Sequence, residues 1–304
     1  MIKRANHFLC LFLFLFLSSA LYAQIFYAVI PESPRPGEPV TIAISITAKQ
    51  ALLIKGDKQF GKAGFFSMSG YMAAVLTIPS TMSPGNAVIR IENEVDTLYE
   101  IPLTIADRKF ASEVIELNPT LTGIRTDPSP QRVNEANRLW SILTTFGDQI
   151  YHTGVFVPPV TSTRRTSFFG DRRVFQYSTG ASDTSIHAGV DYGVPTGTKV
   201  TACGTGKVVL ARSRIVTGNS VVLEHAPGIY SIYYHLDKIE VEEGSMVDTG
   251  TLLGLSGSTG LATGPHLHWE IRVNTENTDP DAFVARPIID KEAINSKINK
   301  YIIY

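Results

Sequence analysis

Cysteine is scarce in this chain. Its 304 residues include only two cysteines, and Cys10 lies inside an apolar amino-terminal stretch. Once that stretch is removed, Cys203 remains alone, and a single cysteine cannot form an internal disulfide. Nor can it supply the several thiolates of a typical structural zinc site. The sequence is therefore compatible with an oxidising compartment, but it predicts no internal disulfide of the kind that forms there.

A strong charge of either sign is also missing. The formal net charge is −1, and it becomes −3 when the two cations Lys3 and Arg4 are lost with the leader described below. No basic stripe follows any predicted strand or helix, as a nucleic-acid-binding surface would require. We therefore expect no nucleic-acid partner.

No apolar run is long enough to cross a membrane. The longest, from Phe8 to Leu17, has ten residues, whereas a spanning helix needs about 20. It follows the basic residues Lys3 and Arg4 and precedes small residues that end at Ala23, which is the pattern of a secretory signal peptide. No small-residue cleavage site precedes Cys10, so a lipoprotein is not predicted. We predict that residues 1–23 are removed, leaving no stable membrane anchor, and that the protein is secreted across the inner membrane to the periplasm or cell envelope of a bacterium.

Residues 24–108 consist of short β-branched runs separated by proline and glycine about every ten residues. This spacing predicts an antiparallel sandwich of immunoglobulin-like size. The segment contains no histidine and no convergent catalytic residue types. We expect an accessory domain that acts as a spacer or docking module, or that contacts envelope proteins or the cell wall.

Residues 109–156 form a predicted connector that contains a helix over about 130–146. Ser129 suits the N-cap and Pro130 the first helical position. Apolar residues recur at helical spacing on one face, and we expect Trp140 on this face to anchor the packing between domains.

The chemistry of the chain centres on two motifs, HAGVD and PHLHWE. The first places His187 and Asp191 four residues apart with Gly189 between them, where the missing side chain is expected to leave room for an ion. The second places His266 and His268 on one face of a predicted strand whose other face is apolar. His187, Asp191 and His268 offer three nitrogen or oxygen donors with one position open, which is typical of a catalytic zinc site.

With the intervening IYYHL segment, which contains His235, these motifs resemble the lysostaphin-type, or LytM-domain, zinc metallopeptidases, which cut peptide cross-links of bacterial peptidoglycan. The resemblance covers about Ser167 to Val273. It implies one Zn²⁺ per chain, held by His187, Asp191 and His268, and a peptidoglycan peptide as substrate. It also implies that His235 and His266 form a catalytic pair that does not bind the metal.

The resemblance implies a mainly β fold, with a LytM-type antiparallel β catalytic domain over residues 157–279 and a C-terminal tail over 280–304. Within this domain, VPTGTKV (194–200) and VEEGSMV (241–247) repeat the pattern V-x-x-G-x-x-V, which predicts two related elements on one core. The same repeat resembles barrel-like carrier domains. Those domains lack the HxxxD pair, and no swinging lysine stands at a hairpin tip here.

The resemblance also implies how the two histidines that do not bind the metal divide the proton transfers. We expect His266 to take a proton from the attacking water and His235 to stabilise the oxyanion or protonate the leaving amine, a division that can also be reversed. Glu270, two residues beyond His268, is expected to orient that ligand. His225 and His152 are assigned no role in the site. The alternative function is a non-catalytic LytM-domain protein that binds and activates other wall hydrolases.

Overall fold

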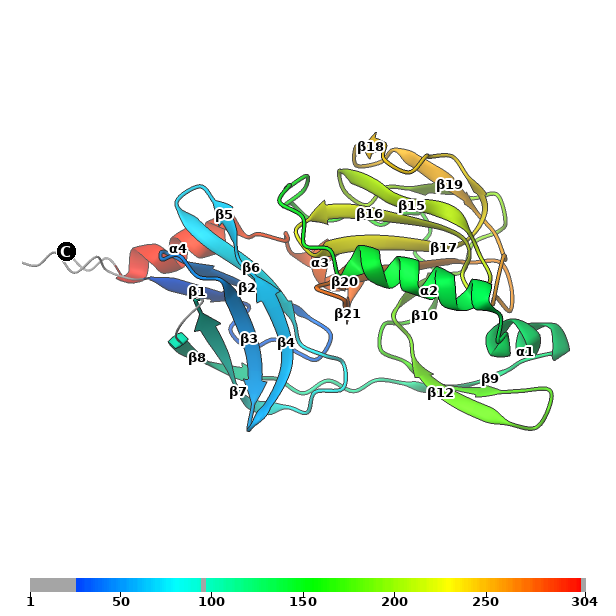
Figure 1. The fold of residues 1–304 in the computed structure, drawn as a ribbon, viewed down its shortest axis with the longest axis horizontal. Helices are drawn as coiled ribbons and strands as arrows, with labels where there is room; N and C mark the ends of the chain where they lie inside the picture. The colour runs from blue at the N-terminus through cyan, green and yellow to red at the C-terminus, as the bar shows by residue number, and fades with distance from the viewer. Residues whose placement is uncertain (1–25, 94–96, 302–304) are drawn as a thin grey trace, which may run out of the picture.

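The computed structural model describes residues 26–93 and 97–301. The predicted signal peptide lies outside this range. The described chain is mainly β and forms an N-terminal part of two sheets and a C-terminal part built on one large sheet (Figure 1).

The N-terminal part contains two four-stranded sheets that face each other. One has the order β1 (Tyr27–Ile30), β2 (Pro39–Ile44), β6 (Tyr71–Thr77), β5 (Phe66–Met68). The other has the order β4 (Lys58–Gly64), β3 (Gln50–Lys55), β7 (Gly85–Glu92), β8 (Thr97–Ile105). Alternate residues of β7, Ala87, Ile89 and Ile91, are buried together with Ile42 of the facing sheet in one hydrophobic cluster. This period of two, with one face apolar, is why the strands pair as two packed layers.

The C-terminal part is organised by a ten-stranded sheet. Its main path is β10 (Arg165–Ser167), β13 (Gly189–Tyr192), β20 (Leu267–Val273), β17 (Ile229–Ile239), β16 (Gly218–Ala226), β15 (Gly206–Arg214), β18 (Met246–Val247). Three further strands complete it: β14 (Lys199–Thr201), β19 (Leu252–Ser256), β21 (Glu276–Thr278). The central strand β20 is buried along most of its length, and Leu267, Trp269 and Ile271 belong to the core as their alternation predicts.

The repeated V-x-x-G-x-x-V pattern forms the same local structure twice. Gly197 and Gly244 both have positive φ, at 88° and 93°, in turns that lead into the short strands β14 and β18. Glycine adopts this backbone conformation at little cost, whereas a side chain strains it.

Part of the predicted connector is built into the C-terminal structure. Strand β9 (Ser112–Glu116) pairs in parallel with β11 (Arg172–Gln176), whose other neighbour is β12 (Ser182–Ile186). Within residues 157–279 every pairing between described strands is antiparallel, and the parallel pairing joins this part to a strand of the connector. The reason is that the chain enters β9 from the N-terminal sandwich and travels through two helices before it returns as β11.

Two helices follow β9: α1 (Pro119–Thr126) and α2 (Pro130–Leu143). The Asn118 side chain caps α1, and the Ser129 side chain accepts a hydrogen bond from the backbone N–H of Arg132 to cap α2. In Figure 1, α2 lies across β16 and β17, where Leu143 packs among buried residues of these strands.

The prediction that Trp140 anchors domain packing is wrong, because its side chain is 57% exposed. Leu139, Ile142 and Leu143 make the contact of α2 with the sheet instead. The helix therefore buries a narrower stripe than its apolar pattern suggested, and Val133 and Trp140 stay at the surface.

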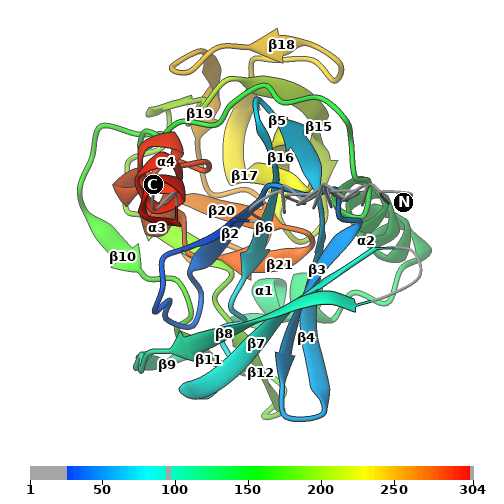
Figure 2. The same ribbon diagram turned by 90° about the vertical axis from the view of Figure 1, so that its left-hand side faces the viewer.

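The chain ends with α3 (Pro280–Ala285) and α4 (Lys291–Tyr301). Helix α4 lies beside β1 of the N-terminal sandwich (Figures 1 and 2), where Ile294 is fully buried and the ammonium of Lys297 pairs with Glu32. The tail therefore connects the two parts of the molecule. Among the described residues, no helix combines the length and apolar character needed to cross a membrane.

Candidate metal centre

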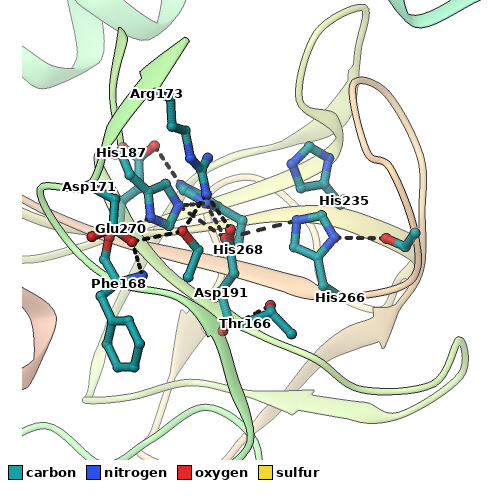
Figure 3. A network of polar contacts seen from close by, with 12 residues as sticks. Thr166, Phe168, Asp171, Arg173, His187, Asp191, His235, His266, His268 and Glu270 are labelled. Atoms are coloured by element: carbon teal, nitrogen blue, oxygen red, sulfur yellow. Dashed lines mark hydrogen bonds and ion pairs between the residues drawn. The ribbon is translucent and has the colours of Figure 1, made fainter. Parts of the chain in front are cut away.

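His187, Asp191 and His268 converge in the structure (Figure 3). Asp191 lies on β13 directly opposite His268 on β20, and His187 comes just before β13. The Nε2 of His187 is 3.1 Å from Asp191 Oδ1 and 3.0 Å from His268 Nδ1, and His268 Nδ1 is 2.7 Å from the same carboxylate oxygen. All three residues are buried. Strand pairing thus brings together two motifs whose residues Asp191 and His268 are 77 positions apart in the sequence.

The hydrogen bonds on the outer side of each ring determine which nitrogen carries a proton. His187 donates Nδ1–H to the carbonyl of Phe168, and His268 donates Nε2–H to the carboxylate of Glu270. The other nitrogen of each neutral ring then presents a lone pair to the centre, as a metal ligand must. Two imidazole lone pairs and a carboxylate oxygen facing one another repel unless a cation lies between them.

The spacing of these atoms fits zinc. Tetrahedral zinc with Zn–N bonds of about 2.0–2.1 Å places neighbouring ligand atoms roughly 3.3 Å apart. The observed separations of 2.7–3.1 Å are slightly shorter than this. The three residues therefore fit a zinc ion with only a small outward movement of the side chains.

The electrostatics of the cluster also favour a positive charge at its centre. Burial disfavours the charged form of His268, but the carboxylates of Asp191 and Glu270 outweigh this effect of burial and raise the pKa of His268 to about 9. Burial likewise opposes ionisation of Asp191, yet His268 and His187 hold the pKa of Asp191 well below its usual range. Burial lowers the pKa of His187. The site thus holds either a proton or a metal cation in strong preference to remaining uncharged.

Glu270 has the orienting role that its spacing predicted. Its Oε1 is 2.9 Å from His268 Nε2, and its Oε2 accepts a hydrogen bond from Arg272. Burial raises the pKa of Glu270, but Arg272 and His268 more than offset this, and the pKa lies below its usual range. An ionised Glu270 fixes the ring of His268 and increases its basicity as a ligand.

Arg173 is a residue of the site that the sequence did not identify. Its Nη2 donates to Asp191 Oδ2 at 2.9 Å and to Ser167 Oγ at 2.7 Å, and its Nε donates to Glu113 Oε1 at 2.6 Å. Glu113 lies on β9, far from the metal-site motifs in sequence. Arg173 lies within the range from Ser167 to Val273 that resembles the family, whereas no sequence signal pointed to Glu113.

The other two predicted site histidines lie beside the cluster and outside it. His266 Nε2 is 3.9 Å from Asp191 Oδ1, and the rings of His266 and His235 have their centroids 4.7 Å apart. His266 donates Nδ1–H to the carbonyl of Gly264, and His235 donates Nδ1–H to the carbonyl of Thr259. Each ring therefore keeps an unprotonated Nε2. Burial lowers the pKa of both rings, and that of His235 to about 3.

Strand alternation along SIYYHL predicts that Tyr233 and His235 share one face, and the structure shows that this prediction is wrong. The hydroxyl of Tyr233 reaches the backbone N–H of Cys203 in the core, while the ring of Tyr234 stacks on His268 at 5.5 Å. His235 also lies on the metal side, with its ring 6.1 Å from His268. The cause is the backbone of His235, whose φ of 62° interrupts the alternation.

The expectation that Gly189 leaves room for an ion is also wrong. A Cβ at this position would lie 2.1 Å from the carbonyl oxygen of Trp269 on the neighbouring strand β20. Gly189 therefore allows β13 and β20 to approach each other, and the space it leaves is filled by backbone. This approach brings Asp191 to His268.

A cavity of about 260 Å³ opens beside the cluster. Ile115 of β9, Arg125 of α1 and Leu117 between them line this cavity. Leu261 and Thr263 also line it, and they belong to the glycine-rich loop over residues 256–266. The cavity has room for a peptide chain next to His266 and the three ligands.

Two further histidines lie away from the metal cluster. His225 is fully buried, donates Nδ1–H to the carbonyl of Thr205 and contacts Ser231 Oγ through Nε2, and burial lowers its pKa to about 3. His152 stacks on Phe156 and contacts the carbonyl of Val155. Both histidines therefore contribute to packing, and the sequence had indicated no part for them in the metal site.

Comparison with known proteins places this geometry in a family. Residues 185–280 match the sequence model of peptidase family M23, and the match includes every residue of the metal cluster. Residues 185–280 therefore form an M23 peptidase segment. The chain is 38% identical over 127 residues to the peptidoglycan DD-endopeptidase ShyA of Vibrio cholerae, covering 42% of this chain and 29% of ShyA. It is 37% identical over 127 residues to the DD-carboxypeptidase/endopeptidase Mpg of Neisseria meningitidis, covering 42% and 28% of the two chains.

The aligned stretch of 127 residues thus spans less than a third of either curated relative. A larger part of this chain resembles the crystal structure of a peptidase M23 candidate from Pseudomonas aeruginosa. That structure has a TM-score of 0.59 and 24% identity, covering 83% of this chain and 94% of its own. At this identity the likeness concerns the fold alone, including much of the part outside the M23 segment.

Proposed function

We propose that this protein is a zinc-dependent endopeptidase that hydrolyses peptide cross-links of bacterial peptidoglycan. The convergence of three lone pairs from His187, Asp191 and His268, with the free nitrogens of two further histidines beside them, carries this proposal. The ShyA and Mpg names, which describe peptidoglycan DD-endopeptidase and carboxypeptidase activities, support the substrate class.

When bound by these three residues, zinc supplies Lewis acidity that polarises an amide carbonyl and lowers the pKa of water from ~15.7 towards about 7. The protein residues provide the proton transfers. His266 is the nearer of the two histidines to the cluster, and its unprotonated Nε2 can accept a proton from the attacking water. His235, beside His266, can stabilise the developing oxyanion or donate a proton to the leaving amine once its free Nε2 has received the proton that His266 took from the water.

The surrounding residues hold this arrangement in place. Arg173 and Glu270 fix Asp191 and His268 from outside the cluster, so that neither ligand has to reorient during the reaction. The carbonyls of Thr259 and Gly264 fix the rings of His235 and His266 in the tautomer that leaves Nε2 free. The cavity between the β9–α1 wall and the glycine-rich loop then receives an extended peptide.

We infer a division of the chain that follows from this function. Residues 1–23 direct export to the periplasm or cell envelope, and residues 24–108 form an immunoglobulin-like accessory sandwich that contacts envelope proteins or the wall. Residues 109–156 connect it to the catalytic domain over 157–279, and 280–304 form the tail. In this division the catalytic sheet corresponds to a duplicated, barrel-like motif.

The alternative is a non-catalytic LytM-domain protein that activates other wall hydrolases. A protein of that kind that has lost its ligands purifies without stoichiometric zinc. The donor set here argues for the enzyme, because all three ligand residues are present and their donor atoms converge on one centre.

Digestion of purified peptidoglycan tests the proposal. The zinc-loaded protein is incubated with sacculi, and the released fragments are analysed by mass spectrometry for new amino termini. We expect cleavage within cross-links, abolished by chelation and restored by zinc. A protein that carries one zinc per chain but releases no new amino terminus from sacculi would contradict the proposed activity.

A further inference from the structure

A second cavity, larger than the one at the metal centre, lies where the two parts of the molecule meet. It has a volume of about 660 Å³, within the range of small-molecule binding sites. The C-terminal end of α2, strand β4 of the sandwich and the β20–β21 turn surround it. We call it the interdomain groove.

The groove combines exposed aromatic rings with hydrogen-bonding groups. Trp140 and Phe146 are 57% and 43% exposed and line it together with the amides of Gln59 and Asn274. Its charged lining residues include two lysines, one of them Lys62, and a single glutamate. Sugar rings present apolar C–H faces and hydroxyl edges, so they are complementary to aromatic faces that are bordered by amides. A protein partner would more commonly meet a groove whose centre is apolar throughout.

Trp140 is not needed for the fold. Helix α2 packs on the sheet through Leu139, Ile142 and Leu143, while the indole of Trp140 remains at the surface of the groove. Phe146 is different, since its ring packs closely against Gly64 of the sandwich and Gly228 of the catalytic sheet. Phe146 therefore forms part of the wall between the two domains, and Trp140 offers a largely exposed indole in the same groove.

The groove is connected to the metal centre by β20. His268 lies near the beginning of this strand, and Val273 at its end lines the groove. Five residues of extended strand span about 17 Å. An extended peptide of about five residues covers the same distance. The separation of the two sites therefore matches the length of a short stem peptide that is attached to a glycan strand at one end and cleaved at the other.

We propose that the interdomain groove binds the glycan strand of peptidoglycan, with the ring of Trp140 stacked on a hexosamine. This proposal rests on the proposed peptidoglycan substrate, but it concerns a separate surface and predicts binding that needs no metal.

Fluorescence isolates the role of Trp140. The chain has two tryptophans, and Trp269 is fully buried, so iodide quenching of the full-length protein reports on Trp140 alone. The probe is a peptide-free oligosaccharide of alternating N-acetylglucosamine and N-acetylmuramic acid. We expect it to protect Trp140 from iodide, with or without zinc. If millimolar oligosaccharide leaves the quenching unchanged, the proposal is wrong.

Matched variants separate glycan binding from catalysis. Trp140→Ala should raise the KM for intact sacculi by about tenfold or more, the usual effect of truncating a central tryptophan of a binding surface. Trp140→Tyr should restore most of the affinity. Val133→Ala, at another exposed apolar position of α2 that does not line the groove, should leave KM unchanged. Hydrolysis of a glycan-free cross-linked peptide dimer should be the same in all these proteins.

Other occupants give different results. If a glycan-free stem peptide protects Trp140 as well as the oligosaccharide does, the groove is a peptide site and the proposal is overturned. Protection that depends on protein concentration alone would assign the groove to a second copy of the chain and would equally overturn it. A protein that binds the oligosaccharide but cleaves no cross-link would retain this inference and refute the proposed activity.

Discussion

Arg173 holds the carboxylate of Asp191 from the side opposite to the two histidines. Its Nη2 lies 2.9 Å from Oδ2, whereas Oδ1 faces His187 and His268. The same guanidinium is fixed by Glu113 on β9. The orientation of a metal ligand therefore depends on a strand of the predicted connector, which pairs with β11 in a separate three-stranded sheet.

This contact predicts a measurable loss of metal affinity. Arg173→Lys keeps the charge but cannot contact Asp191, Ser167 and Glu113 together, and Glu113→Gln removes the charge that holds Arg173. We expect the zinc dissociation constant to rise by roughly 10- to 100-fold in each variant, the range for lost outer-shell partners. Competition with a chromogenic chelator measures it. Glu116→Gln on the same strand is the control, and equal affinities in Arg173→Lys and the native protein would refute the role.

The three ligands should be individually required for zinc. His187→Ala, Asp191→Ala or His268→Ala leaves two donors, which hold the ion far more weakly. Elemental analysis of the purified variants should show a loss of zinc, and hydrolysis of sacculi should stop. His152→Ala, outside the cluster, should retain both. A full equivalent of zinc in His187→Ala would show that the ligand assignment is incorrect.

His266 and His268 should separate chemistry from metal binding. His268→Ala should lose zinc and activity together, because its Nδ1 is one of the three donor atoms that would hold the ion. His266→Ala should keep zinc, while kcat falls by about 100- to 10,000-fold, as for the loss of a general acid or base. His235→Ala should resemble His266→Ala. Zinc content and kcat measured on the same preparations decide the question, and metal loss in His266→Ala with retention in His268→Ala would reverse the two roles.

Zinc binding should depend on pH through His268. With Asp191 and Glu270 raising its pKa to about 9, this ring carries a proton in the metal-free protein at neutral pH. Zinc must displace that proton, so the apparent affinity should rise as the pH increases towards about 9. Calorimetry in buffers of different ionisation enthalpy should detect about one proton released per zinc at pH 7. Proton uptake, or no exchange of protons, would contradict this protonation state.

Gly189 should be required for folding of the site. A methyl group there would meet the carbonyl oxygen of Trp269 at 2.1 Å, so Gly189→Ala must separate β13 from β20. We expect a loss of unfolding free energy of about 3 kcal/mol, at the upper end for overpacking, together with weaker zinc binding. Gly123→Ala in α1 is the matched control, since nothing lies within 4 Å of its new methyl group. Denaturant unfolding should show Gly123→Ala to be stabilised by roughly 0.5–1 kcal/mol, and an equally stable Gly189→Ala would refute the packing argument.

The sequence by itself determined much of the catalytic chemistry. The short spacings in HAGVD and PHLHWE placed imidazoles and a carboxylate on strands, and donor chemistry then indicated a zinc site; the structure brings these donors together. The cap and first-turn residues Ser129 and Pro130 likewise marked the start of α2. These features are local, because hydrogen-bond geometry within a few residues decides them.

Tertiary structure alone decided the features that depend on contacts between distant segments. Glu113 reaches Arg173 only because β9 pairs in parallel with β11, and neither residue carries a sequence signal of that pairing. The left-handed backbone of His235 placed two successive side chains on the metal side, which strand periodicity excluded. Trp140 looked like a core residue in a periodic pattern, but the sheet beneath α2 accommodates only a narrow stripe of that helix. In each case packing against a segment remote in sequence determines the conformation. Local sequence patterns contain no information about that packing.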